Sequence, residues 1–459
     1  MPPSATHPGE SESPHWFPDP STFVLHNGLR VIAVSRDRSP VVEARLVTGS
    51  GFAADPPERE GLAGMAMAMV TEGALQIDGE PLDTIADSLG AVFDGRAGAD
   101  GATIAMSALS GNLEAALACF SSLIQGANFS DRAVDAIRVS RHALIEHERQ
   151  AALGLAMRLL PPILYGAEHP YARPLSGSGT TGGVTAVTAD DLRRYFAQLS
   201  PERSTLVIAG PLEAARMITV LENTLGNWLA SGRALKAADQ APPVARIQSP
   251  VVTIVDRPDT RQASIVVGLQ SPARGAIEAH AQIAAEAILA GLFTSRLNLN
   301  LREGKGWTYG VRSTLLAGRL CGLWLLTTAI RRDRAALAMD EIAREIDNLA
   351  FREPCSADEL GHAVDSLVAR MPSSYETCGQ ISDALADTVM YQLPTDYHQV
   401  LAARLRGLRP SDISEFFRQI LSRGGPRWLL VGDASELFAQ LDGGDWGKID
   451  IIDGGRNLP

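Results

Sequence analysis

The chain has 459 residues, of which 45% are hydrophobic and 20% charged, a composition that is ordinary for a globular protein of two or more domains. The formal net charge is −12 and no sustained run of lysine and arginine occurs, so nucleic acid is excluded as an expected partner. No apolar stretch of about 20 residues predicts a membrane span, and the four cysteines have neither CxxC nor zinc-finger spacing.

The amino-terminal segment, residues 1–20, is rich in proline, serine and glutamate, and this composition predicts a flexible tail. The segment lacks a basic start followed by an apolar run, so it does not predict a signal peptide, and a cytoplasmic location is expected. The mature form of a periplasmic protein would show the same pattern. From residue 23, apolar runs flank Asn27-Gly28, a dipeptide that predicts a β-hairpin at the start of the folded chain.

Two helical segments in the two halves of the chain share one pattern. Residues 188–199 and 409–420 have Asp, an aliphatic residue, an aromatic residue, Phe, Gln and an aliphatic residue in register, and both predict amphipathic helices with polar starts. Each is followed by a short apolar strand that ends in glycine, at Gly210 in the first half and at Gly432 in the second. The two copies lie about 220 residues apart, a separation of domain size.

The same order recurs further upstream in each half. Residues 42–47 and 262–267 predict strands, and each strand leads through a loop to an alanine-rich helix, expected at 61–72 and 278–291. Three matches in one order predict two copies of a single α+β domain. Each copy is expected to form a mainly antiparallel sheet with helices on one face.

The predicted domain boundaries follow from this repeat. The first domain is expected to cover residues 21–235 and the second residues 251–459. Between them, residues 236–250 lose periodicity and contain Pro242-Pro243, which predicts a linker.

Short motifs along nearly the whole chain occur in the order and spacing of one peptidase family. They are Asn27-Gly28-Leu29-Arg30, Gly61-Leu62-Ala63, Tyr165-Gly166, His169-Pro170-Tyr171, Leu289-Ala290-Gly291, Ser295-Arg296-Leu297, Leu301-Arg302-Glu303, Met371-Pro372 and Leu393-Pro394-Thr395. Taken together, they resemble the insulinase or pitrilysin (M16) family of zinc peptidases, and in particular its bacterial and mitochondrial-processing branch.

The resemblance implies a clam-shell in which two related chains, each with two α+β domains, enclose a chamber. Active members carry His-x-x-Glu-His on their first helix, where both histidines bind one zinc ion, the glutamate activates a water and a downstream glutamate is the third ligand. In this chain Gly64 and Ala68 stand at the histidine positions and Met67 at the glutamate position. None of these side chains binds zinc as an imidazole does or takes up a proton near neutral pH, so no metal is expected in this chain.

Two other sets of ligands bear on this expectation. The methionines of the same helix are spaced two residues apart, which spreads them around the helix, so core packing is expected rather than a soft-metal site. The third-ligand position falls at Glu146 or His147, and His142 lies four residues before Glu146. Whether these three residues bind a metal stays open, although a lone helix offers at most two well-placed ligands.

Arg302 and Tyr309 match an arginine and a tyrosine that family members place in their second domain. In the family, these residues bond to the backbone of a peptide in the active site of the facing chain. Arginine offers a fixed fork of donors, and a tyrosine hydroxyl can stabilise charge on a carbonyl oxygen. A helix that ends near Glu303, a glycine turn and a strand that begins at Tyr309 are expected to bring both side chains to one junction. The alternative is a surface ion pair for Arg302 and sheet packing for Tyr309.

The sequence therefore predicts the non-catalytic subunit of a heterodimeric M16-type zinc metallopeptidase, inactive on its own. Its expected partner is a homologous chain that has an intact HxxEH motif and holds the zinc, and its substrates are short or unfolded peptides. One alternative is a catalytically inert scaffold protein of the same fold. Another is an autonomous hydrolase with a metal site near His142 and Glu146. The sequence does not indicate which peptide sequence is preferred or whether the isolated chain forms homodimers. It also does not indicate whether the chamber opens and closes.

Overall fold

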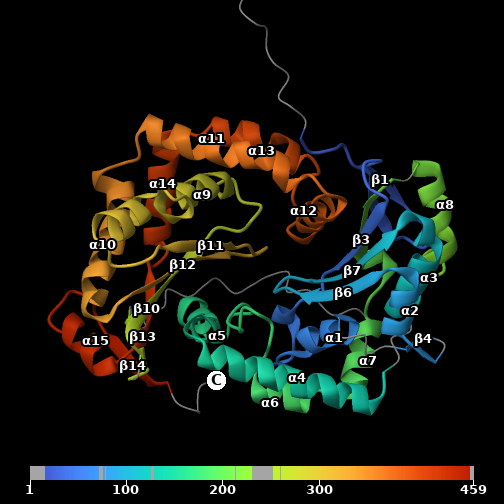
Figure 1. Cartoon of the computed structure of the whole chain (residues 1–459), viewed down its shortest axis with the longest axis horizontal. Coiled ribbons are helices and arrows are strands. Elements are labelled where there is room, and N and C mark those ends of the chain that lie inside the picture. Colours follow the sequence, from blue (N-terminus) through green and yellow to red (C-terminus); the bar gives the residue numbers. More distant parts are fainter. Residues whose placement is uncertain are drawn as a thin grey trace, which may run out of the picture.

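The computed structural model describes residues 16–71, 76–77, 79–125, 129–211, 213–229, 252–258 and 260–454. The predicted linker, 236–250, and most of the predicted tail lie outside these residues. Within them the chain forms two six-stranded sheets with helices packed against them, so the predicted α+β fold is confirmed (Figure 1). In the described ranges, no helix is long and apolar enough to cross a membrane.

The first sheet has the strand order β1-β2-β8-β3-β7-β6. Its strands are β1 (Ser21–Val24), β2 (Arg30–Ser35), β3 (Val41–Thr48), β6 (Val92–Ala97), β7 (Ala102–Leu109) and β8 (Ser204–Gly210). All neighbours are antiparallel except β2 and β8, which are parallel. The predicted hairpin is formed by β1 and β2, with Gly28 at a φ of +90° in its turn. A separate two-stranded ribbon is formed by β4 (Gln76–Ile77) and β5 (Glu80–Pro81).

The second sheet repeats this arrangement. Its strands are β9 (Val252–Asp256), β10 (Gln262–Ser271), β11 (Arg312–Leu316), β12 (Gly322–Arg331), β13 (Arg427–Gly432) and β14 (Ile449–Asp453). The order β9-β13-β10-β12-β11 matches β2-β8-β3-β7-β6, with one parallel pair, β9 and β13, at the same place. The outermost strand differs, because β14 is parallel to β9 whereas β1 is antiparallel to β2.

The helices also follow the repeat. In the first half they are α1 (Leu62–Thr71), α2 (Leu82–Leu89), α3 (Leu113–Gln125), α4 (Asp131–Gln150), α5 (Ala152–Tyr165), α6 (Thr181–Ala186), α7 (Ala189–Ala197) and α8 (Ala214–Thr224). In the second half they are α9 (Ala279–Glu286), α10 (Ala335–Asp347), α11 (Ala357–Ser374), α12 (Cys378–Met390), α13 (Tyr397–Arg406), α14 (Pro410–Ser422) and α15 (Ala434–Leu441). The matched helices α7 and α14 both begin with a capping box, in which Asp191 and Asp412 return a hydrogen bond to the cap residue.

Each sheet receives one covering helix from the other half of the chain. Helices of the same half cover one face of each sheet, and the second face also carries buried apolar residues. In the first sheet that second face packs against α12, and in the second sheet it packs against α5. In Figure 1, α5 and α12 accordingly lie between the two sheets. The sequence predicted helices on one face of each sheet. This prediction holds for the helices of the same half, whereas a helix from the other half covers the second face.

The exchanged helix α5 packs closely on β10 and β13. Leu160 is fully buried and lies directly over Gly268, where a Cβ atom would come within 2.6 Å of the Leu160 side chain. At the end of the helix, the Tyr165 hydroxyl donates a hydrogen bond of 2.9 Å to the carbonyl oxygen of Gly322. The helix thus joins the second sheet through both apolar packing and a buried hydrogen bond.

The exchanged helix α12 joins the first sheet in a comparable way. It packs on β3 and β8, and the Met390 sulfur would lie 2.5 Å from a Cβ atom at Gly101. At its exposed side, Arg45 of β3 forms ion pairs with Glu43 at 2.7 Å and with Asp383 of α12 at 3.0 Å. Contacts in both directions therefore fix the two halves to each other.

The segment before β1 also contacts the second half. Phe17 is 2% exposed, and its ring stacks on that of His398 and meets Tyr375 edge to face. Nδ1 of His398 accepts a hydrogen bond from the Tyr375 hydroxyl at 3.0 Å, and its Nε2 donates to the carbonyl oxygen of Ala384 at 3.0 Å. The end of the predicted tail of residues 1–20 is therefore packed into the fold.

Acid is expected to weaken the fold through His398. Burial lowers the pKa of this imidazole to about 4, and the charge of Arg274 adds to the decrease, although the hydrogen bond to the Ala384 carbonyl oxygen opposes it. The unfolded chain binds the proton near pH 6.5, so stability is lost as the pH falls from 6.5 towards 4, by up to about 3 kcal/mol. Urea unfolding at several pH values, compared between the natural chain and His398→Gln, measures this contribution. A stability difference between the two that is constant over that range would contradict the expectation.

Candidate functional site

The helix on which the resemblance places the degenerate metal positions, α1, is a packed core element in this chain. In α1, Met65, Met67 and Met69 are at most 2% exposed, as expected for core packing. The main chain of Met67 also touches β6, since a Cβ atom at Gly95 would lie 2.5 Å from the Met67 carbonyl oxygen. Of the three degenerate positions, Gly64 and Met67 are buried and Ala68 is half-buried.

The start of α1 is held by the side chain of Asp55. Its Oδ2 accepts a hydrogen bond from the amide of Gly61 at 2.9 Å, and its Oδ1 accepts one from Ala63 at 3.1 Å. Arg173 donates to the Asp55 carbonyl oxygen at 2.7 Å and pairs with Glu60 at 3.0 Å. Burial raises the pKa of Asp55 to about 7, although the two amides and the charge of Arg173 oppose the rise.

Gly64, at the first histidine position, has no space for a side chain. A Cβ atom there would lie 2.3 Å from the carbonyl oxygen of Gly177 and 2.4 Å from a terminal guanidinium nitrogen of Arg141. The first contact is with main chain, which cannot move aside as a flexible side chain can. The second brings a positive charge from α4 to the position that the resemblance assigns to a zinc-binding histidine. Zinc binding is therefore opposed at this position by sterics and by charge.

The candidates for a third ligand face away from this position. Arg141 is the α4 residue against Gly64, whereas Glu146 and His147 are exposed on the other side of the helix. Glu146 accepts a hydrogen bond from Gln150 at 3.0 Å, and His142 lies 3.3 Å from the hydroxyl of Thr185 in α6. Across the described residues, no group of three His, Cys, Asp or Glu side chains is arranged to hold a metal ion.

A buried ion pair that the sequence reading missed fixes the glycine loop beside α1. Arg158 of α5 donates to Glu148 of α4 at 2.8 Å, to the Ser178 hydroxyl at 2.7 Å and to the carbonyl oxygen of Gly179 at 2.8 Å. The Ser178 hydroxyl also donates to Glu148 at 2.7 Å. The Arg158 and Glu148 side chains are 1% and 10% exposed. These bonds place the loop that carries Gly177 against Gly64.

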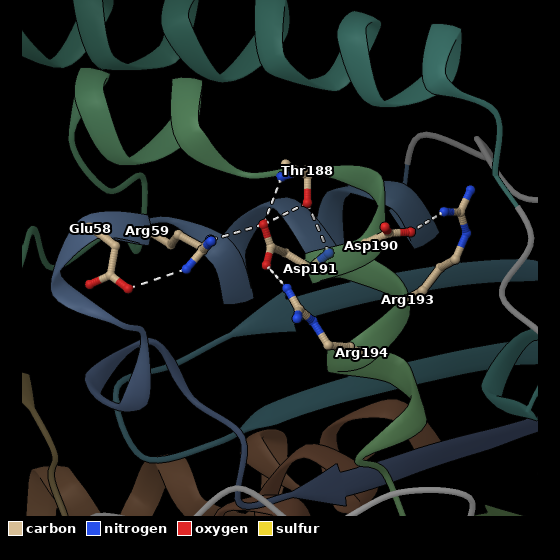
Figure 2. A network of polar contacts seen from close by, with 7 residues as sticks. All are labelled: Glu58, Arg59, Thr188, Asp190, Asp191, Arg193 and Arg194. Atoms are coloured by element: carbon tan, nitrogen blue, oxygen red, sulfur yellow. Dashed lines mark hydrogen bonds and ion pairs between the residues drawn. The ribbon is translucent and has the colours of Figure 1, made fainter.

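A second polar network joins the segment that precedes α1 to the start of α7 (Figure 2). Asp191 accepts hydrogen bonds from the amide and hydroxyl of Thr188 and from Nε of Arg59 at 2.9 Å, and it pairs with Arg194. Burial alone would raise the pKa of Asp191, but the bonds from Thr188 and the two guanidinium charges outweigh burial and lower it. The network is structural, because each of its charged groups has a partner.

Arg302 lies on the surface in a π-helical turn, η6 (Asn298–Gly304), where the sequence predicted the end of a helix. Its side chain is 40% exposed and forms an ion pair with Glu303 at 3.2 Å. The guanidinium lies over the ring of Phe293, 4.6 Å from the ring centre. Gly306 follows at a φ of +62°, so the glycine turn forms as predicted.

Tyr309 is 91% exposed and does not start a strand. Thr308 forms an isolated bridge to Ile330, and β11 begins only at Arg312. Tyr309 borders a pocket of about 310 Å³ between β10, β12 and the segment before β11, and Leu153 of α5 closes one side of it. Neither Arg302 nor any described residue of α1 lines this pocket. The positions of the degenerate metal site on α1 therefore lie away from the Tyr309 pocket, and Arg302 contacts Phe293.

The segment between α9 and Arg302 is a helix end, as the sequence predicted for the glycine there. The π-helical turn η5 (Ala287–Gly291) closes the helix at Gly291. Arg296 then forms a two-pronged ion pair with Glu359 of α11, with both nitrogen–oxygen distances at 2.8 Å. These contacts are internal to the fold.

Comparison with known proteins finds a family match that runs from the end of the first half of the chain into the second half. Residues 186–367 match the model of the peptidase M16 inactive domain. An uncharacterised zinc protease of Mycobacterium leprae is 28% identical over 193 residues, which are 40% of this chain and 41% of that protein. One from Mycobacterium tuberculosis is 31% identical over 156 residues, 33% of this chain and 34% of that protein. The chain thus spans about two fifths or less of the length of these curated relatives.

Solved structures match over a larger part of the chain. A peptidase M16 inactive domain from Pseudomonas fluorescens has a TM-score of 0.80 at 22% identity and covers 90% of this chain and 98% of its own. The periplasmic protease PqqL of Escherichia coli has a TM-score of 0.72 at 17% identity and covers 94% of this chain, which matches 49% of that protein. At these identities the structures show a common fold. With the match of residues 186–367 to the peptidase M16 inactive domain, they confirm the resemblance predicted from the sequence, and the chain shares the fold of these solved structures.

Proposed function

We propose that the chain is the non-catalytic subunit of a heterodimeric M16-type zinc metallopeptidase. Its partner in this proposal is a homologous chain that carries an intact HxxEH motif and binds the zinc. The present chain completes the chamber and holds the backbone of a short or unfolded peptide through Arg302 and Tyr309, while the partner breaks the bond. The expected cofactor of the assembled enzyme is therefore zinc in the partner subunit.

The observation that carries the proposal is the closure of Gly64. A metal helix that had merely lost its ligands would leave a cavity, but here Gly177 and Arg141 occupy the space that a histidine would need. The surrounding structure is built around the absence of a side chain. This arrangement supports a chain whose fold has been kept for a purpose other than metal catalysis.

The exposure of Arg302 and Tyr309 supports the substrate-holding role. A tyrosine that is 91% exposed adds little to the stability of the isolated fold, because burial of its ring would be the source of that stability. The hydroxyl and the Arg302 guanidinium edge are accessible to a peptide. The match of this chain to 49% of the protease PqqL supports an assembly of two such units, since that protein has length for a second unit in the same chain.

The closure of Gly64 can be tested by stability and by metal content. Gly64→Ala is expected to lower the free energy of unfolding by about 1–3 kcal/mol, since the main chain of Gly177 blocks the added methyl group. Gly361→Ala is the matched control, because Gly361 is also helical and has open space around its Cβ position, and it should gain about 0.5–1 kcal/mol. Urea unfolding measures both variants.

The same geometry predicts that restoring the motif does not restore the metal. A chain with Gly64→His, Met67→Glu and Ala68→His is expected to bind no stoichiometric zinc in metal analysis, because Arg141 remains at the site. The unaltered chain, pure and alone, is expected to cleave no peptide. Stoichiometric zinc in either protein, together with cleavage that a chelator stops, would favour an autonomous hydrolase.

The substrate-holding role is tested in the assembled complex, purified through a tag on this chain. Arg302→Ala is expected to lower kcat/KM for an unfolded peptide about 10- to 100-fold, as for the loss of a charged hydrogen bond, and to leave the zinc content unchanged. Arg352→Ala is the control, since Arg352 is likewise an exposed arginine at the end of a π-helical turn, η8 (Asn348–Arg352). Unchanged cleavage by Arg302→Ala would remove the proposed role. A complex without zinc or peptidase activity would instead favour a scaffold.

A further inference from the structure

Phe293 and Arg302 form a contact that the function proposed above does not require. Phe293 follows Gly291 by two residues and is 59% exposed. The guanidinium of Arg302 lies 4.6 Å from the centre of its ring. Single exposed aromatic side chains are common, so the informative feature is the charged group stacked on this one.

The segment that carries Phe293 is held rigidly by a buried asparagine. Asn298 is 7% exposed, and its Oδ1 accepts a hydrogen bond from the amide of Val311 at 2.8 Å. The two N–H groups of its Nδ2 are shared among four acceptors at 3.1–3.3 Å, the Ser295 hydroxyl and the carbonyl oxygens of Ala290, Leu292 and Val311. One side chain thus joins the turn on both sides of Phe293 to the segment before β11. The main chain that carries the ring is therefore held in place.

Apart from the Phe293 ring, the contacts of the Arg302 side chain restrain it only weakly. Within the described residues, its carboxylate partner is Glu303, which is 3.2 Å away, 49% exposed and its neighbour in sequence. An exposed pair of this kind restrains a long side chain only slightly. A guanidinium stacked on an aromatic face is restrained in its plane and keeps its N–H donors free at its edge. Stacking therefore orients Arg302 without consuming the donors that a peptide carbonyl would use.

We propose that Phe293 is a positioning residue for Arg302. It holds the guanidinium plane so that the free N–H groups point outward before a peptide arrives, which removes part of the ordering cost of binding. This inference rests on the function proposed above, because the benefit of a fixed Arg302 lies in substrate binding. Phe293 itself need not touch the peptide.

The first test uses the isolated chain and is independent of peptide cleavage. In the natural chain, the ¹⁵Nε–H group of Arg302 is expected to show restricted motion by NMR relaxation and a shift from the aromatic ring current. Phe293→Leu should raise the motion to that of a free surface arginine, and Phe293→Trp should restrict it again. Phe351→Leu is the matched control, because Phe351 is 58% exposed and, among the described residues, has no guanidinium over its ring. Unchanged motion in Phe293→Leu would overturn the proposal.

The second test is a double-mutant cycle in the purified complex. Phe293→Leu is expected to lower kcat/KM about 2- to 5-fold, the size of an exposed cation–π contact, and Phe293→Trp should restore it. In the Arg302→Ala background the same substitution should have no further effect, since its target is gone. Equal losses in both backgrounds would show that Phe293 does not act through Arg302. If Arg302→Ala alone had no effect, the proposed function would fail, while the NMR result would still decide whether Phe293 orients the arginine.

Discussion

The exchange of α5 and α12 between the two halves is the constraint on which the rest of the structure depends. Each sheet buries apolar residues on both faces, and the helices of its own half cover only one face. The second face is buried by a helix from the other half, so neither half can remove its sheet from water alone. A buried leucine such as Leu160 contributes about 2 kcal/mol, and α5 presents several. The two halves are therefore one packed unit, and the Tyr309 pocket, which includes Leu153 of α5, depends on that packing.

Contacts within the chain stabilise α1, in place of the stabilisation that a bound metal ion would give. In zinc proteins, ligand binding is part of the folding free energy. Here Asp55 satisfies the first amides of α1, and the Arg158–Glu148 pair fixes the loop that covers Gly64. Removing one partner of a buried ion pair costs about 3–5 kcal/mol, because the other charge is left unpaired. The region is thus a specific structure in its own right.

Much of the fold could be predicted because short local sequence patterns indicate the repeat. The Asn27-Gly28 turn, the capped helices that begin near Asp191 and Asp412, and the strands after them all depend on neighbouring residues, and they form as expected. The helix exchange could not be predicted in this way. Periodicity shows that one face of α5 is apolar, but it does not show which sheet that face meets, and Pro161-Pro162 inside the helix obscure its extent.

The candidate site was predictable to the same degree. The assignment of Gly64, Met67 and Ala68 to the metal frame stays a prediction from the sequence, and the contact of Gly64 with Arg141 needed the fold, because it joins residues far apart in the chain. The helical period could have indicated that Glu148, rather than Glu146 or His147, lies on the buried face with Ile145. No local pattern signals the π-helical turns at η5 and η6, and these turns set the contact between Phe293 and Arg302.

The two parts of the candidate site differ in what they contribute to the isolated chain. Around Gly64, the contacts with Gly177 and Arg141 and the hydrogen bonds of Glu148 are internal to the fold, so these groups stabilise the isolated chain. The side chains of Arg302 and Tyr309 are exposed and are not covered by other parts of the described chain. Groups that are held in place but left uncovered gain their free energy only when another molecule arrives. Recognition through backbone carbonyl oxygens would be nearly independent of peptide sequence, so under the proposed function any selectivity has to come from side-chain pockets on the partner or from the unfolded state of the substrate.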